Sequence, residues 1–310
     1  MGSSTDRKCE VDDDIIGALE RGREQFLALV GPVRGELHRY CARMTGSIAD
    51  GEDVVQETLA RACYELSQMK ELPPLRPWLF RIAHNRAVDH WRHESYRRTE
   101  PLEVAAEHVD ELEREPDNVL ARRQAVRAAL SCFLELAPAQ RGCVILKDVL
   151  DHSIDEIAVE LSLSVPAVKA ALHRGRTSLQ LLGEASSTGP RGTAMSPALL
   201  RYATLFNAHD WDGVRALLAD DVKLDLVSRR KAAGRREVGT YFTNYERAAD
   251  WRLTAAWLDG REVLAAWRGA GSSRPDYFIA LSWHRDQVIA IRDFRYVPYI
   301  AREGRFEFVG

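Results

Sequence analysis

The chain has 310 residues, of which 45% are hydrophobic and 29% are charged, and its formal net charge is −3. This length and composition indicate two or three globular domains, and the small net charge means that a nucleic-acid surface would need locally sorted charges. The chain has no apolar run long enough to span a membrane, and its polar, acidic N-terminus differs from a secretory signal. We therefore expect a cytoplasmic protein with no membrane partner.

The five cysteines include no C-x-x-C pair, which favours reduced thiols over a zinc site. The sequence also lacks a glycine-rich phosphate-binding loop. These patterns predict a protein that holds no cofactor or metal and hydrolyses no nucleotide.

Residues 20–98 are expected to be almost wholly helical. One helix is predicted over residues 25–44. A second is predicted over residues 52–69, where the acidic start suits the positive end of the helix dipole. Prolines at positions 73, 74 and 77 mark a break, and another helix starts near Trp78.

Arginines crowd around this third helix, together with Trp91 and Tyr96. Cations mixed with aromatic rings suit single-stranded nucleic acid, because bases stack on the rings while cations hold phosphates. Aromatic residues at helical spacing are more often core, so both interpretations stay open for Trp91 and Tyr96. The segment Glu100–Asp117 then contains eight acids and one basic residue, which is typical of a flexible connector.

Two short amphipathic helices follow, joined by a tight turn. Ser153 and Glu156 have the spacing of a capping box before an apolar run, and Ser164 can cap the second helix, where Pro166 is tolerated in the first turn. The buried stripe of the second helix is predicted to comprise Val165, Val168, Leu172 and Leu179.

The opposite face of the second helix carries only positive charge, on Lys169, His173, Arg174 and Arg176. This arrangement predicts a helix-turn-helix whose second helix enters a DNA major groove. Lys169 lies early in the helix, where base edges are usually reached, whereas Arg174 and Arg176 are better placed for phosphates. A solvated helical hairpin is the plain alternative.

Two segments of the first domain resemble conserved region 2 of the sigma-70 family of RNA polymerase sigma factors. They are D-G-E-D-V-V-Q-E-T-L-A-R-A at 50–62 and R-P-W-L-F-R-I-A-H-N-R-A-V-D-H-W-R at 76–92. The helix-turn-helix with its trailing A-L-H-R-G-R resembles region 4. With no region 3 between them, the layout is similar to the extracytoplasmic-function (ECF) type. Leu59 and Cys63 depart from the pattern, since many members carry aromatic residues there, and we expect both to pack in the core.

The resemblance implies that region 2 binds the β′ coiled coil of core RNA polymerase and reads the −10 element, and that region 4 binds the β flap and reads the −35 element. The implied polymerase contacts are Asp53, Gln56 and Glu57. The implied −10 contacts are Arg81, His84, Asn85, Arg92, Arg97 and Arg98. For the −35 element they are Ser164, Lys169, His173, Arg174 and Arg176.

A second linker, at 183–197, is rich in Gly, Ser, Thr and Pro, and residues 198–310 change character. Helical segments are expected at 199–207, 211–218 and 236–247, and strands at 222–227, 251–258, 262–268, 277–284 and 288–296. Helices followed by a meander of strands predict an α+β domain with a curved sheet wrapped on helices.

The phrase F-N-A-H-D-W-D-G-V-R-A-L-L-A-D-D-V at 206–222 resembles the SnoaL-like polyketide cyclases of the nuclear-transport-factor-like superfamily. The resemblance implies a cone with an apolar pocket and, in ECF sigma factors, regulation in cis. Asp225, His284 and Asp293 could approach each other, and one of them could act as a general base, although we expect no catalysis. The candidate pocket residues are Trp211, Asp225, Tyr241, Tyr277, His284 and Asp293.

The predicted architecture is therefore two all-α sigma domains followed by an α+β cone. The expected boundaries are 20–98 for region 2, 99–117 for the acidic linker, 118–182 for region 4, 183–197 for the second linker and 198–310 for the SnoaL-like domain. Two alternatives remain: a ligand-responsive helix-turn-helix regulator that needs no polymerase, and a cyclase or isomerase with a DNA-binding appendage.

Overall fold

The structure is a computed structural model that describes residues 5–98, 130–185, 194–248, 250–269, 272–304 and 306–308, with side chains from residue 21 on and without those of 94–98 and 183–185. The predicted acidic linker at 99–117 lies outside the described residues. The chain divides into two compact units, one built from most of residues 5–176 and the other from most of residues 177–308. We call them the helical unit and the α+β unit and describe each by itself.

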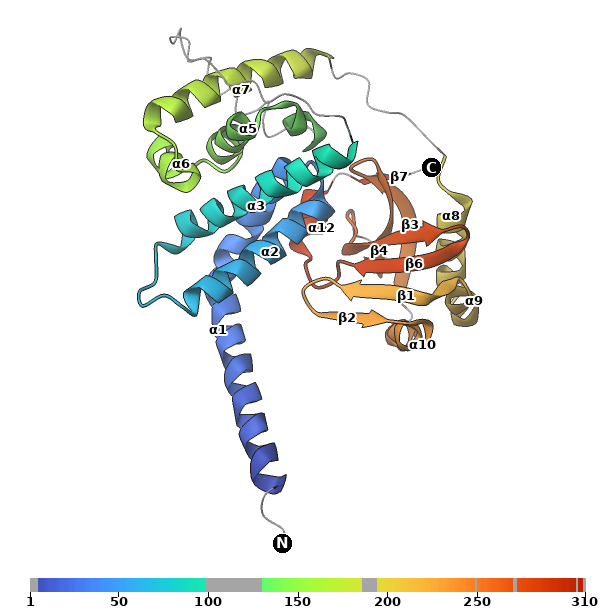
Figure 1. Cartoon of the computed structure of the whole chain (residues 1–310). Helices are drawn as coiled ribbons and strands as arrows, with labels where there is room; N and C mark the ends of the chain where they lie inside the picture. The colour runs from blue at the N-terminus through green and yellow to red at the C-terminus, as the bar shows by residue number, and fades with distance from the viewer. Residues whose placement is uncertain are drawn as a thin grey trace. The chain divides into compact units, whose positions relative to one another are not determined.

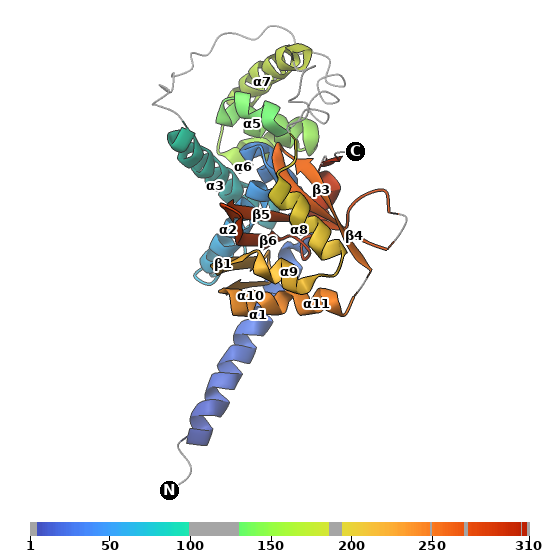
Figure 2. The ribbon, with the colours of Figure 1, turned by 90° about the vertical axis from the view of Figure 1, so that its right-hand side faces the viewer.

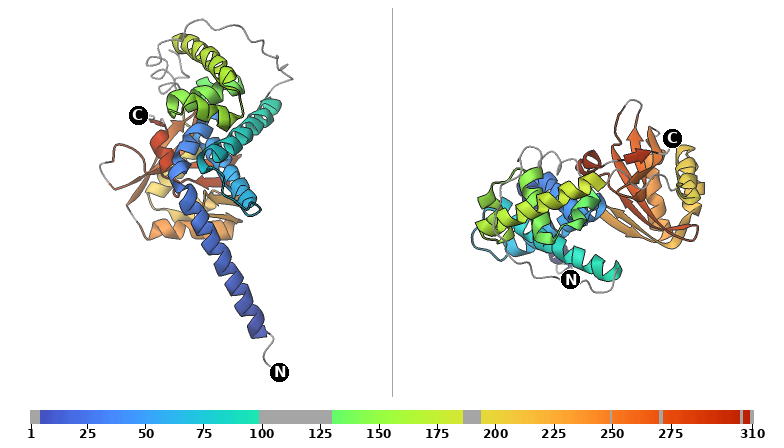
Figure 3. Two further views of the ribbon diagram at one scale, coloured as in Figure 1. Left: turned by 90° about the vertical axis from the view of Figure 1, so that its left-hand side faces the viewer. Right: turned by 90° about the horizontal axis from the view of Figure 1, so that it is seen from above.

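The first part of the helical unit contains α1 (Thr5–Thr45), α2 (Ile48–Leu66) and α3 (Leu75–Arg98). The three predicted helices are confirmed, although α1 begins 20 residues earlier than expected. Helices α1 and α3 lie side by side (Figures 1 and 3) and pack through fully buried residues such as Leu37, Tyr40 and Phe80. Leu59 is buried as predicted, but Cys63 is exposed, so the packing expectation is wrong for Cys63.

The next part contains α5 (Pro138–Val144), the π-helical turn η2 (Ile145–Val149), α6 (Ile154–Leu161) and most of α7 (Val165–Ala185). The preceding 3-10 helix η1 (Leu130–Glu135) is grouped with the α+β unit. The capping box at the start of α6 is confirmed, since the Glu156 N–H donates to Ser153 Oγ and the Ser153 N–H donates to the Glu156 carboxylate. Ser162, in the left-handed region at φ 56°, closes the turn between α6 and α7. The helix-turn-helix is therefore formed as its sequence predicts.

Helix α7 buries Val168, Leu172 and Leu179 of the predicted stripe. It continues through Ala185 and so includes the first residues of the predicted second linker. Among the described helices, none is both long enough and apolar enough to cross a bilayer.

After α8 and α9, the rest of the α+β unit consists of two strands, three short helical turns, four consecutive strands, a short helix and a last short strand. Its elements are α8 (Pro197–Asn207), α9 (Trp211–Ala216), β1 (Leu218–Leu226), β2 (Arg230–Ala233), α10 (Arg235–Gly239), η3 (Thr240–Phe242), α11 (Thr243–Glu246), β3 (Trp251–Leu258), β4 (Arg261–Arg268), β5 (Tyr277–His284), β6 (Gln287–Asp293), α12 (Tyr299–Glu303) and β7 (Phe306–Phe308).

The seven strands form one sheet in the order β2-β1-β6-β5-β4-β3-β7. Strands β3 to β6 form the predicted antiparallel meander, but β1 joins β6 in parallel, with Leu226 opposite Asp293. Helix α8 packs against β3 and β4 (Figure 2) and closes one face of the sheet. On the other face, Phe278 and Phe294 stack with their ring centroids 4.3 Å apart. The predicted α+β class is therefore correct, with a mixed sheet.

Candidate nucleic-acid interface

The start of α7 presents polar and cationic side chains away from its buried stripe. Lys169 is exposed, and His173 and Arg174 are half-buried. Ser164 is exposed and accepts a hydrogen bond from the Ala167 N–H at 3.3 Å, so it caps the helix as predicted. These four residues lie on the side of α7 that faces DNA when the second helix of a helix-turn-helix binds in a major groove.

Arg176 has a different place from the one we expected. It is 7% exposed and donates two hydrogen bonds to Asp148 of η2, from Nε to Oδ2 at 3.0 Å and from Nη2 to Oδ1 at 2.7 Å. A guanidinium in a buried bidentate pair has its donors occupied. The prediction of Arg176 as a phosphate contact is therefore corrected, because this side chain fastens α7 to η2.

The predicted −10 residues on α3 divide into two groups. Arg81, Asn85 and Arg92 are exposed, and Arg92 Nη1 lies 3.8 Å from Asp89. His84 instead is half-buried, and its Nδ1 lies 2.7 Å from the Tyr40 hydroxyl. Burial, aided by the nearby Arg141 charge, lowers the pKa of His84 to about 4. The side chains of Arg97 and Arg98 lie outside the described residues.

Helix α2 carries the predicted polymerase contacts on its solvent side, where Asp53 and Gln56 are half-buried and Glu57 is exposed. The neighbouring acid Glu52 is fully buried and is 2.7 Å from Arg34 Nη2. Helix α2 therefore carries a buried acid, Glu52, next to acids that face solvent, and the sequence pattern does not distinguish the two kinds.

Arg141, which the sequence reasoning missed, joins the two parts of the helical unit. Its side chain is completely buried, and it donates to the Met44 carbonyl at 2.6 Å and to the Leu136 carbonyl at 2.9 Å. Its guanidinium also lies over the ring of Trp91, 5.5 Å from the centroid. Trp91 is therefore engaged inside the chain.

A second polar contact between the two parts surrounds His152, which is 1% exposed. Its Nδ1 lies 2.8 Å from Glu160 Oε2, and its Nε2 lies 3.0 Å from Glu36 Oε1, which also accepts a hydrogen bond from Arg76 at 2.5 Å. Burial lowers the pKa of His152, but the hydrogen bonds to Glu160 and Glu36 outweigh burial and raise it to about 8. A protonated imidazole can donate to both carboxylates.

In the α+β unit, three of the six candidate pocket residues come together. Asp293 is fully buried and accepts hydrogen bonds from Tyr241 at 2.5 Å and from Tyr245 at 3.2 Å, and the Tyr245 and Tyr277 hydroxyls are 2.6 Å apart. Burial raises the pKa of Asp293 despite these hydrogen bonds. The sequence reasoning missed Tyr245, and also Tyr202, whose hydroxyl is buried with no hydrogen-bond partner in the described part of the chain.

The other three candidates lie elsewhere. Asp225 is opposite Arg292 in the parallel pair of strands, on the face away from Asp293, and its Oδ2 lies 3.8 Å from Arg292 Nε. His284 is exposed at the tip of the β5–β6 hairpin, whereas Asp293 pairs with Ile279. The proposed approach of Asp225, His284 and Asp293 is therefore wrong.

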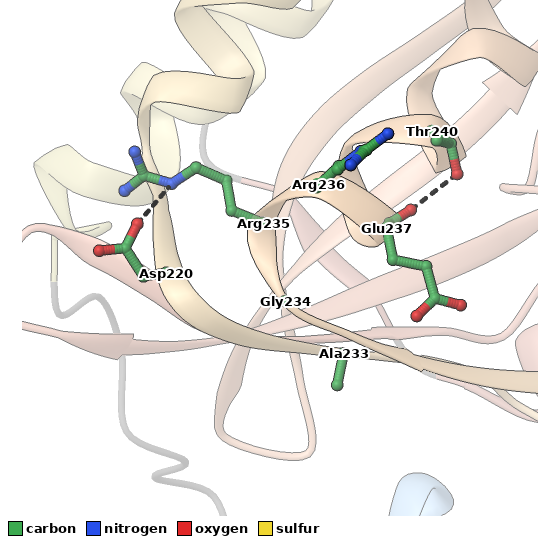
Figure 4. A pocket seen from close by; sticks show the side chains of 7 residues that line it. All are labelled: Asp220, Ala233, Gly234, Arg235, Arg236, Glu237 and Thr240. Atoms are coloured by element: carbon green, nitrogen blue, oxygen red, sulfur yellow. Dashed lines mark hydrogen bonds and ion pairs between the residues drawn. The ribbon is translucent and has the colours of Figure 1, made fainter.

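Trp211 is packed against the hydrophobic core, edge-on to Phe206. A hollow on the surface of this unit is lined by Asp220, Gly234, Arg235, Arg236 and Glu237, among others (Figure 4), and none of the six candidates lines it. Within the described residues, no three His, Cys, Asp or Glu side chains gather as metal ligands would.

The helix-turn-helix exposes Lys169 and leaves His173 and Arg174 half-exposed. Together with the three-helix part before it and the α+β unit after it in the chain, this motif defines a DNA-binding protein with an appended domain. Residues 29–97 match the family "Sigma-70 region 2", and residues 127–179 match "Sigma-70, region 4". Residues 199–295 match the SnoaL-like domain.

The ECF RNA polymerase sigma factor SigF of Caulobacter vibrioides is 33% identical over 153 residues, covering 49% of this chain and 80% of SigF. SigG of Mycobacterium tuberculosis is 32% identical over 217 residues, and the match spans 61% of this chain but 58% of SigG. The chain therefore belongs to the ECF family of RNA polymerase sigma factors. The crystal structure of M. tuberculosis SigJ matches at a TM-score of 0.34 and 22% identity, covering 86% of this chain and 95% of SigJ.

Proposed function

We propose that this protein directs core RNA polymerase to specific promoters. Region 2, formed by α1 to α3, binds the polymerase and opens and reads the −10 element. Region 4, formed by α5 to α7, binds the β flap and reads the −35 element. The protein acts in the cytoplasm, where the polymerase and the chromosome are, and is itself no enzyme.

The observation that carries this proposal is the exposed face of α7 in a chain that also has region 2. Lys169 is free to enter a major groove, and Arg174 and His173 follow on the next turn. A one-sign helix face repels itself unless it meets anions, and DNA phosphate supplies them. For the polymerase contact, we assign the β′ coiled coil to the solvent side of α2 at Asp53, Gln56 and Glu57.

For the −10 element, the exposed Arg81, Asn85 and Arg92 supply phosphate and base contacts. His84 belongs to the same set once its bond to Tyr40 is released. Arg97 and Arg98 extend the set along the last turn of α3.

We assign the SnoaL-like domain a regulatory role in cis. Its interior contains an aromatic core and a cluster of tyrosines around Asp293, and we assign this unit a regulatory role instead of catalysis. Removal of residues 190–310 should change promoter output, and the direction of that change gives the sign of the regulation. Equal transcription by the full chain and by residues 1–189 would contradict this role.

The test is in vitro transcription with bacterial core polymerase on a library of genomic fragments, using the full chain. Specific transcripts that disappear in the Asp53→Ala/Glu57→Ala variant would support the proposal. A gel shift with and without core separates it from a simple regulator, because a regulator binds its duplex without polymerase. Absence of both transcripts and core binding would overturn the proposal.

A further inference from the structure

We propose that the α+β unit binds the phosphate backbone of duplex DNA through Lys223, Lys231 and Arg292, on the face of the sheet that carries Asp225. We call these three residues the sheet-face cations. The inference goes beyond the proposed function, because it assigns a DNA contact to a part of the chain outside regions 2 and 4.

Strand register places the sheet-face cations on one side of β2, β1 and β6, which are neighbours in the sheet (Figure 1). Lys231 on β2 is opposite Asp225 on β1, and Asp225 is opposite Arg292 on β6. Lys223 lies two residues before Asp225 in β1, so its side chain points to the same side. Neighbouring strands are about 4.8 Å apart and alternate residues of a strand are about 6.7 Å apart, so the three cations surround Asp225 closely.

The charges on this face do not cancel. Lys223 and Lys231 are exposed, and neither has an acidic ion-pair partner in the part of the chain that the structure describes. The Asp225 carboxylate lies 3.8 Å from Arg292 Nε and offsets one of the three cations. The remaining positive charge repels itself unless an anion is bound, and DNA phosphate is such an anion.

The segment that follows β1 adds further positive charge. Residues 229–236, R-R-K-A-A-G-R-R, contain five basic residues and no acid. Arg230 and Arg235 are paired with acids, at 2.5 Å and 3.3 Å, but both pairs are exposed to solvent and are therefore weak. Arg236 is exposed and lines the surface hollow (Figure 4). In a chain of net charge −3, this segment concentrates positive potential at one place.

The shape of this face favours a duplex over a single strand. Small residues lie beside the cations, since Ala233 and Ala290 flank Lys223 and Ser282 is opposite Ala290. These three small side chains offer no ring on which an unpaired base could stack. They allow a phosphate backbone to approach, while Arg292 is held over the Phe294 ring with its Cζ 5.2 Å from the centroid.

The connection to region 4 keeps the α+β unit near bound DNA. Helix α7 ends at Ala185 and α8 begins at Pro197, so a fully extended connection spans at most about 40 Å. A duplex bound by α7 is therefore presented to the sheet-face cations at a high effective concentration. We expect them to contact DNA next to the −35 element. This position on the promoter, but not the contact itself, rests on the proposed function.

Lys223→Gln/Lys231→Gln is the variant that tests the contact. Both side chains are exposed, so the substitutions remove two charges without disturbing the core. The matched control is Arg201→Gln/Arg285→Gln, which removes the same charge from α8 and from the turn between β5 and β6, where both arginines are exposed. Thermal unfolding of the full-length proteins checks that both variants keep the wild-type fold.

The first measurement is fluorescence anisotropy of a short fluorescein-labelled duplex of random sequence, with the full-length chain and without polymerase. The slope of log K against log salt should fall by about 1.8 in the lysine variant, at about 0.9 for each lost phosphate contact. Between 50 and 200 mM salt, its affinity should fall about tenfold less than that of the wild type. The control should keep the wild-type slope. An unchanged slope in the lysine variant, or an equal decrease in the control, would overturn the inference.

The second measurement locates the DNA on the α+β unit by photocrosslinking. Benzoylphenylalanine is placed at position Ala233, beside the sheet-face cations, or at position Leu200, which is 46% exposed on α8. We expect the duplex to crosslink at position 233 and not at position 200, and a single strand of the same length to crosslink less. Absence of the crosslink at position 233, or stronger capture of the single strand, would overturn the proposed duplex contact.

Both measurements omit polymerase, so they separate this inference from the proposed function. The expected slopes and crosslinks, without any specific transcript from core polymerase, would overturn the proposed function alone. Specific transcripts together with a wild-type slope in the lysine variant would overturn only the contact through the sheet-face cations.

Discussion

Asp148 and Arg176 form a buried bidentate ion pair, in which Asp148 is 2% and Arg176 is 7% exposed. The two residues are 28 positions apart and join the π-helical turn η2 to the middle of α7. The pair therefore fixes the orientation of the helix that we propose for the −35 element.

Breaking this pair should destabilise region 4. Arg176→Ala leaves the buried Asp148 carboxylate uncompensated, and such a loss typically costs about 3–5 kcal/mol. We expect the lower unfolding free energy to appear in urea denaturation, with the half-buried Arg174→Ala as the control at under about 1 kcal/mol. If Arg176→Ala is as stable as the wild type and its DNA binding depends less on salt, then Arg176 contacts phosphate after all.

Lys169 and Arg174 should affect DNA binding in different ways. Arg174→Ala should weaken binding to all −35 sequences and reduce the slope of log K against log salt by about 0.9, the value for one phosphate contact. Lys169→Ala should change the ranking of −35 sequences, at about 1–3 kcal/mol for the preferred base. Holoenzyme binding to a −35 library at several salt concentrations measures both, and identical effects of the two variants would contradict the distinction.

The region 2–region 4 contact should weaken in alkali. His152 has a pKa near 8 in the folded chain, against 6.5 for the free side chain, so its stabilisation is complete below about pH 6.5 and is lost as pH rises through 8. Glu36 and Glu160 favour the protonated ring, while Arg76 opposes it. The Glu36 pKa, lowered to about 2, leaves that carboxylate ionised throughout this range.

The expected loss of unfolding free energy between pH 6 and pH 9 is about 2 kcal/mol from His152. His152→Gln should remove this part of the pH dependence while leaving the contributions of other groups. Urea denaturation of the two proteins across the range measures the difference. Parallel pH profiles would mean that His152 stays neutral in the folded chain.

Asp293 should tolerate an amide better than an alkyl side chain. Its pKa is raised by burial, so ionisation of the folded carboxyl costs free energy as pH rises above 3.8, and Asp293→Asn should be at least as stable as the wild type at neutral pH. Asp293→Leu leaves the Tyr241 and Tyr245 hydroxyls without their acceptor and should cost about 1–3 kcal/mol. The control is Asp225→Asn, on the other face of the sheet. Thermal unfolding checks the order, and an Asn variant as unstable as Leu would contradict it.

Local chemistry accounts for the elements that the sequence predicted well. Ser153 and Glu156 form their capping box within one turn, and β3 and β5 match the predicted ranges residue for residue. Strand β2 was missed because its four residues, R-K-A-A, show no apolar alternation, and its place is set by pairing with β1. Short edge strands of this kind depend on a neighbour that the sequence does not identify.

The candidate sites were harder to predict, because their partners are distant in the chain. A cationic helix face was visible, but the partner that removes Arg176 from it lies in another element. The sequence suggests Asp225 and Asp293 as neighbours in a pocket. Because Asp225 is opposite Arg292 and not Asp293, their side chains point to opposite faces of the sheet, and this register is not visible in the sequence. Arg141 belongs to no recognisable sequence motif. It is buried because α5 packs on α1, and the sequence does not reveal this contact.

The two edges of the sheet differ in how they avoid further pairing. Strand β2 carries Arg230 and Lys231 in the open, and β7 has only three residues, although Phe308 is 44% exposed. The charges on β2 and the short length of β7 both disfavour pairing with a strand from another molecule. We therefore expect this domain to resist edge-to-edge aggregation even at the high concentrations of an overexpressing cell. Replacing Arg230 and Lys231 by neutral residues should increase aggregation through the β2 edge only.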